Sequence, residues 1–93
     1  MNKLEPFRPC GNIAISSTAK LIYLALRDAI EYGEYVVIPQ RHIAETLGIS
    51  RKAVSANLRR LEQAGAIAIE PLYNRYGGRL PNKYRLRGQQ HVG

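Results

Sequence analysis

The longest periodic pattern of apolar residues lies in residues 17–33, "STAKLIYLALRDAIEYG". Apolar side chains recur there at the i, i+3, i+4, i+7 and i+8 positions of one helix face. The predicted face consists of Ile22, Ala25, Leu26, Ala29 and Ile30, widened by Leu21 and Leu24. Ser17 is a suitable N-cap and Gly33 a suitable stop, so we predict a core helix between them.

Two shorter patterns follow. The run "EYVVIP", residues 34–39, is rich in β-formers and closed by a proline, so it predicts one brief strand or an extended link. In "QRHIAETLG", residues 40–48, Ile43, Ala44 and Leu47 share one side, which predicts a helix of barely two turns ending at Gly48. His42 has no second metal ligand beside it, so we interpret it as a surface or partly packed side chain.

A third helix is predicted from about Arg51 to Ala64. Ser50 is its N-cap, Gly65 its stop, and the apolar stripe is Val54, Leu58 and Leu61. Steps of about 100° per residue put a different set opposite this stripe. That outward side holds Lys52, Ala56, Arg59 and Gln63, flanked by Ser55 and Arg60. Asn57 falls nearer the core side and is predicted to be structural.

The last pattern predicts a β-hairpin. "AIAIEPLY" alternates through Ile67 and Ile69, and "KYRL" alternates through Tyr84 and Leu86. Between them, "YNRYGGRLPNKYRL", residues 73–86, holds no acidic residue. It holds four basic residues, namely Arg75, Arg79, Lys83 and Arg85. The Gly77–Gly78 pair is expected to make the tip supple.

The elements occur in the order helix, strand, helix, turn, helix, hairpin. A chain of 93 residues suits a single domain with one core. We predict an α+β winged helix-turn-helix: three helices, a short strand and a C-terminal β-hairpin wing. Residues 1–15 are predicted to be an N-terminal arm, residues 16–87 the domain, and residues 88–93 a tail.

The charge is distributed unevenly. Residues 1–50 carry five basic and five acidic residues, whereas residues 51–93 carry nine basic and two acidic residues, so the second half holds the whole net charge of +7. Such an asymmetry favours a polyanionic partner. No apolar run approaches the roughly 20 residues of a membrane span. The lone Cys10 and the lack of an apolar leader favour a cytoplasmic protein, and Cys10 is assigned no role.

The outward side of the third helix has the chemistry of a major-groove reader. Arg51 and Lys52 can donate to guanine, Ser55 can reach a base edge or a phosphate, and Ala56 lets the backbone approach a thymine methyl group. Arg59 and Arg60 lie farther along and are expected at phosphates. We call these six residues the basic face. In the wing, Arg75, Arg79 and Lys83 are expected to follow the DNA backbone or enter the minor groove.

The stretch "LGISRKAVSANLRRLEQAGAIAI" resembles the recognition segment of the winged helix-turn-helix superfamily. The matching residues are Gly48, Ile49, Ser50, Val54, Leu58, Leu61 and Gly65. Ala53 and Ala66 depart from the pattern, since Thr and a larger aliphatic residue are usual there. The resemblance implies sequence-selective binding of double-stranded DNA, with the third helix in the major groove.

A narrower resemblance covers residues 13–87. "ISSTAKLIYLALRD" and "GGRLPNKYRL" are similar to helix-turn-helix domains of plasmid and phage replication initiator proteins and related bacterial transcription regulators. In the wing the matching residues are Gly78, Arg79, Asn82, Tyr84 and Leu86. The resemblance therefore implies either transcription regulation or a replication-associated role.

Two other binding functions stay open. The same fold could dock another protein of a replication or transcription complex, and Tyr73 and Tyr76 could stack on RNA bases. No catalytic triad, carboxylate pair or phosphate loop is present, so no enzyme activity, cofactor or metal is predicted. No small-molecule effector site is evident. A homodimer is open, with the first helix or the N-terminal arm as its candidate interface.

Overall fold

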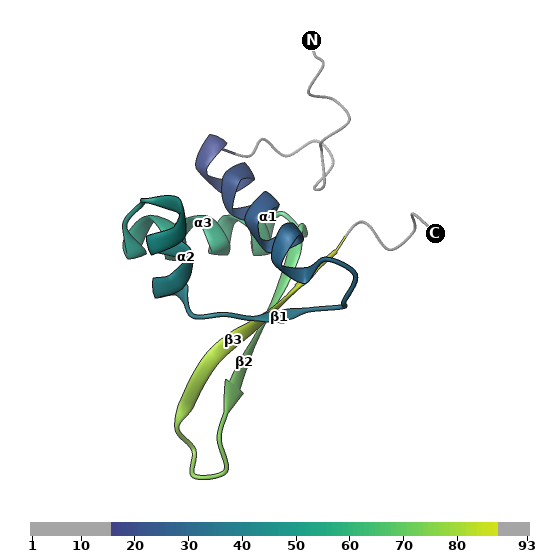
Figure 1. Cartoon of the computed structure of the whole chain (residues 1–93), viewed down its shortest axis with the longest axis vertical. Helices are drawn as coiled ribbons and strands as arrows, with labels where there is room; N and C mark the ends of the chain where they lie inside the picture. Colours follow the sequence, from purple (N-terminus) through teal and green to yellow (C-terminus); the bar gives the residue numbers. More distant parts are fainter. Residues whose placement is uncertain (1–15, 88–93) are drawn as a thin grey trace.

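The computed structural model describes residues 16–87. The predicted arm with Cys10 and the predicted tail lie outside the described residues. The elements are α1 (Ser17–Ile30), β1 (Val36–Val37), α2 (Gln40–Leu47), α3 (Arg51–Gln63), β2 (Ile67–Tyr73) and β3 (Arg79–Leu86). The strands form one antiparallel sheet in the order β1-β3-β2. The helices gather at one end and the β2–β3 hairpin extends away from them (Figure 1). The predicted α+β winged-helix class is confirmed.

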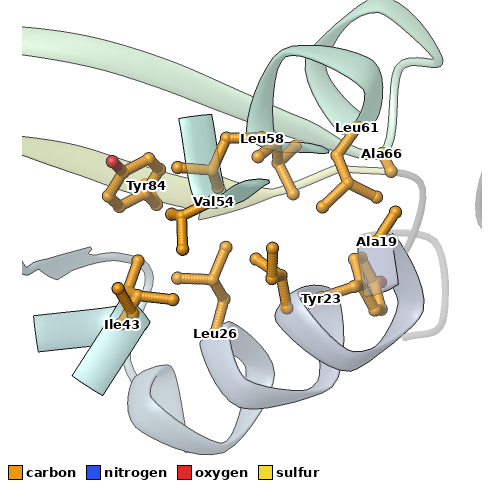
Figure 2. Packing of buried hydrophobic residues seen from close by; sticks show 12 residues of the cluster. Ala19, Tyr23, Leu26, Ile43, Val54, Leu58, Leu61, Ala66 and Tyr84 are labelled. Atoms are coloured by element: carbon orange, nitrogen blue, oxygen red, sulfur yellow. The ribbon is translucent and has the colours of Figure 1, made fainter. Parts of the chain in front are cut away.

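One apolar core joins the three helices to the sheet. Figure 2 shows Val54, Leu58 and Leu61 of α3 pointing toward Tyr23 and Leu26 of α1. The same cluster includes Ala19, Ile22, Ile43, Ala44, Ala66, Ile67 and Tyr84. Burial raises the pKa of the Tyr84 phenol above its ordinary value, with the nearby Asn82 and Gln40 side chains opposing the shift. The ring is therefore held in its neutral form inside the core.

The start and the buried face of α1 differ from the sequence prediction. Ser16, not Ser17, is the N-cap, because its Oγ accepts a hydrogen bond of 3.0 Å from the Ala19 N–H. The buried stripe is Ala19, Ile22, Tyr23, Leu26 and Ile30, while Leu21 and Ala29 are exposed. Burial of the large Tyr23 ring removes more apolar area from water than burial of Ala29 would, which favours the observed face.

The end of α1 also differs from the prediction. The helix ends at Ile30, three residues before the predicted stop at Gly33. Glu31 adopts φ 51° and ψ −115°, and the Gly33 N–H donates to the Ile30 carbonyl over 2.8 Å. These dihedrals are close to the first central position of a type II′ turn, about +60° and −120°, where glycine is normally found. Glu31 is therefore strained at a position that suits glycine.

The ends of the two following helices are as predicted. Gly48 ends α2 in a left-handed conformation with φ 68°, and the Ser50 Oγ caps α3 by accepting from the Ala53 N–H over 3.0 Å. Gly65, with φ 80°, follows α3, and the Ala66 N–H donates to the Leu61 carbonyl, which is a Schellman ending. The helix-turn-helix of α2 and α3 is thus specified by local backbone chemistry.

The wing is a two-stranded hairpin with one irregularity. Ile69 pairs with Tyr84 and Glu70 with Lys83, but the register shifts between Glu70 and Leu72, where β3 carries one extra residue. Pro71 and Pro81 lie at this shift, where their missing N–H groups break the fewest ladder hydrogen bonds.

The tip of the wing, which was expected to be supple, carries hydrogen bonds of its own. The Asn74 Oδ1 accepts hydrogen bonds from the N–H groups of Tyr76 (2.8 Å) and Gly78 (2.9 Å). The Asn74 N–H donates to the Gly78 carbonyl over 2.9 Å, which closes the turn. Gly77 has φ 87° and supplies the left-handed residue that the turn needs. Asn74 therefore holds the turn at the tip through hydrogen bonds, and the sequence analysis, which considered only the two glycines, did not predict this role.

The strain at Glu31 leads us to predict that a glycine there stabilises the domain. Glu31→Gly should raise the free energy of unfolding by about 1 kcal/mol, because glycine accepts this backbone conformation without a steric penalty. In a domain of this size the melting temperature should rise by about 4 to 8 °C. Glu34→Gly is the matched control, since Glu34 lies in the same exposed loop and has no positive φ. Equal melting temperatures of the two variants in thermal unfolding would contradict the strain at Glu31.

Candidate nucleic-acid interface

The basic face lies along the side of α3 that points away from the core. Arg51, Lys52, Ala56, Arg59 and Arg60 are exposed and Ser55 is half-buried, while Val54, Leu58 and Leu61 on the opposite side are buried. The six predicted residues are therefore brought together on one surface. All except Arg51 line a single open hollow, which Gln63 completes. Arg51 stands at the first turn of the helix, beside this hollow.

The turn before α3 sets the direction of this face. The Ile49 N–H donates to the Ala44 carbonyl over 3.1 Å, and the Ile49 side chain packs against the core. The Ser50 cap then starts α3 immediately afterwards. Since α3 contacts α1, α2 and β2, its orientation is determined by packing on three sides. His42 lies exposed on α2, in agreement with its interpretation as a surface side chain.

Asn57 anchors α3 to the start of α1. Its side chain is buried, and its Nδ2 donates to the Ala53 carbonyl over 2.8 Å. Its Oδ1 accepts from the Ser16 Oγ over 2.9 Å and from the Arg60 Nη1 over 3.2 Å. The predicted structural role of Asn57 agrees with this geometry. Periodicity alone did not indicate that Ser16, the N-cap of α1, is one of its partners.

The bond to Asn57 also limits the donors that Arg60 has available for DNA. One of its N–H groups is already used inside the protein, although a guanidinium has five donors and keeps others for a phosphate. Arg59 is exposed and has no such contact to Asn57. The two arginines are both exposed, but Arg60 is hydrogen-bonded to a buried side chain of its own helix and Arg59 lacks that bond.

Two wing arginines are exposed and oriented by neighbours. The Arg79 Nη2 donates to the Asn82 Oδ1 over 2.8 Å, and its guanidinium carbon lies 5.6 Å from the centre of the Tyr73 ring. Arg75 lies 5.8 Å from the centre of the Tyr76 ring. Such cation–π contacts restrict an arginine without neutralising it. Both arginines thus present positive charge along the projecting hairpin.

Lys83 has a different environment. Its Nζ lies 3.6 Å from the Glu70 Oε1 and 4.4 Å from the centre of the Tyr35 ring, and only 21% of its side chain is exposed. Glu70 is its partner in the strand register. The sequence predicted Lys83 as a DNA contact of the wing, and neither the strand register nor the approach of Tyr35 can be inferred from local pattern. Lys83 is the least available of the three predicted wing cations.

Residues 16–87 hold neither a cluster of potential metal ligands nor a membrane-spanning helix. In that range no group of three or more His, Cys, Asp or Glu side chains is placed to hold a metal ion. No helix there has the length and apolar character needed to cross a bilayer. A helix-turn-helix with a basic outward face and a basic wing defines the class: a winged helix-turn-helix DNA-binding domain.

Comparison with known families agrees with this class. The model of the Crp-like helix-turn-helix domain matches residues 18–87, which include every element from α1 to β3. The chain belongs to this family of DNA-binding domains. No curated protein and no solved structure matches the chain.

The Asn57 contacts make a second stability prediction. Asn57→Ala should lower the free energy of unfolding by about 1 to 3 kcal/mol, because it removes the Oδ1 that accepts from the Ser16 hydroxyl and from the Arg60 Nη1. Gln63→Ala is the control on the exposed side of the same helix and should stay within about 0.5 kcal/mol. Urea denaturation of both variants measures the difference. Equal stability of the two would show that the Ser16–Asn57 contact does not hold α3.

Proposed function

We propose that this domain is a sequence-selective transcription regulator of a bacterium, phage or plasmid, acting in the cytoplasm on the nucleoid. The observation that supports it most is the two-sided character of α3. Its apolar side is buried in the core and its other side is exposed, short-chained near Ala56 and rich in Lys and Arg. This is the arrangement that a helix needs to enter a major groove.

The proposed roles follow from reach and charge. Arg51, Lys52 and Ser55 on the first turns of α3 select the sequence through base edges, and Ala56 permits close approach. Arg59 and Arg60 contact phosphates. In the wing, Arg79 and Arg75 supply backbone contacts, and Lys83 contributes less because Glu70 and Tyr35 already engage it.

A replication-associated role is the second candidate. It rests on the resemblance of the wing to those of replication initiator proteins. Two of the matching residues have a folding role that any such wing would need: Tyr84 lies in the core, and Asn82 holds Arg79. The motif therefore supports a wing of this shape more strongly than it supports replication. For this reason we place transcription regulation first.

A protein-docking function is the competitor from another class. It does not require nine basic residues against two acidic ones in the half of the chain that contains α3 and the wing. Selection of bound duplexes from a random DNA pool separates the two, since only a DNA-reading domain yields a recurrent motif. A palindromic motif would in addition indicate that two copies bind as a dimer.

Salt dependence tests the phosphate contacts. If the domain neutralises about five phosphates, the plot of log K against log salt concentration should have a slope of about −4 to −5. Fluorescence anisotropy with a labelled duplex at several salt concentrations measures it. Binding that is indifferent to salt would contradict DNA binding through the basic face and the wing.

Substitutions separate sequence choice from affinity. Lys52→Ala or Ser55→Ala should reduce the preference for the selected site over a scrambled duplex, because these side chains face base edges. Arg79→Ala should weaken binding to both duplexes by about the same factor, and Lys83→Ala should weaken it less. Competition binding with the two duplexes gives both values. A change of the preferred site in Arg79→Ala would assign the wing to base reading instead.

A further inference from the structure

The tip of the wing presents an aromatic ring to solvent. The Gly77 N–H donates to the Asn74 carbonyl over 3.0 Å, which makes Arg75 and Tyr76 the two central residues of a turn. Tyr76 is 86% exposed and lies outside the core cluster, so packing of the core does not require its ring. The Arg75 guanidinium, 5.8 Å from the ring centre, covers at most one face of the ring. The other face is therefore open to a ligand.

The backbone that carries this ring is held by hydrogen bonds within the tip. The Asn74 Oδ1 accepts from the N–H groups of Tyr76 and Gly78. At the base of the wing, Tyr84 is buried in the core that α3 shares. From Lys83, the last residue paired with β1, to Gly78 the hairpin spans about 16 Å at about 3.3 Å per residue. A ring presented in this way gives up little conformational freedom when it binds.

The surroundings of the ring suit a polyanion that carries flat apolar groups. Residues 73–86 hold no acidic residue, and Arg75 and Arg79 are both exposed. A protein partner that covered the ring with apolar side chains would strip water from these cations without supplying a counter-charge. A single DNA strand supplies both parts, because its bases stack on an aromatic ring while its phosphates meet the cations. In a closed duplex the faces of each base are covered by neighbours, so this contact requires an unpaired base.

We propose that Tyr76 is a stacking site for one unpaired base of DNA, with Arg75 and Arg79 at the phosphates beside it. The inference goes beyond the proposed function and rests on it for one point, that α3 brings duplex DNA to the wing. It adds a second binding activity to the domain. The domain then binds more tightly where the DNA next to its site is locally unpaired.

The test compares paired and unpaired positions beside the selected site. With the full chain, each base pair within about one helical turn, or about ten base pairs, of the selected motif is replaced in turn by a mismatch. At one or two adjacent positions the affinity should rise about fivefold or more, which is the lower end of what one stacked base contributes. A fluorescent adenine analogue at that mismatch should be quenched on binding, because it stacks on the ring.

Three variants assign the effect to the tip. Tyr76→Ala removes the ring and keeps the backbone N–H that Asn74 binds, so the gain from the mismatch should fall below about twofold. Tyr76→Phe keeps the ring and should keep the gain. Tyr32→Ala is the matched control and should leave the gain unchanged, since Tyr32 is 101% exposed in the loop between α1 and β1, away from the tip (Figure 1).

The outcomes separate the stacking site from the proposed function. Selective, salt-dependent binding to which no mismatch adds affinity overturns the stacking site and leaves the proposed function intact. A gain that persists in Tyr76→Ala, or is lost in Tyr76→Phe, also overturns stacking by this ring.

A single-stranded oligonucleotide that carries the analogue decides the inference if no duplex is selected and the proposed function fails. Quenching that Tyr76→Ala abolishes would support the stacking site, and an absence of quenching would overturn it. Tighter binding of RNA than of DNA of the same sequence would overturn the assignment to DNA.

Discussion

Burial of one side of α3 is the constraint on which the rest of the structure depends. Val54, Leu58 and Leu61 pack against both other helices and the sheet, so the opposite side has only solvent to face. Apolar burial alone is non-directional and would tolerate a small rotation of the helix. The hydrogen bond from the Ser16 hydroxyl to the Asn57 Oδ1 adds direction, because it ties one side of α3 to the start of α1.

Sequence patterns predicted the elements whose limits are set by local chemistry. Gly48, Ser50 and Gly65 act through dihedrals and caps that involve neighbours in the chain, so α2 and α3 could be placed almost to the residue. The limits of α1 could not, because Ser16 and Ser17 are equally good caps by type. The C-terminal end of α1 is followed by a turn toward β1. Glu31 lies in that turn with a positive φ, which a residue other than glycine seldom adopts.

The candidate site, like the helices, could be predicted only where local sequence determines it. Helical periodicity identified the basic face because the apolar stripe on the opposite side of α3 is clear. The wing cations could not be ranked, because their surroundings arise from strand register and from a distant loop. Lys83 meets Glu70 across the hairpin and Tyr35 from the segment before β1, whereas Arg79 meets Asn82 three residues away. Contacts between segments far apart in sequence leave no periodic signal.

The two prolines at the register shift have a consequence for solubility. Among the described residues β2 is an edge strand along its whole length, and β3 also has an unpaired edge where the wing extends past β1. An open edge can pair with a strand from another molecule. Pro71 and Pro81 stand on these two strands, and a proline has no N–H group to donate to an added strand. The prolines therefore lower the tendency of the hairpins of two copies to join into one aggregating sheet.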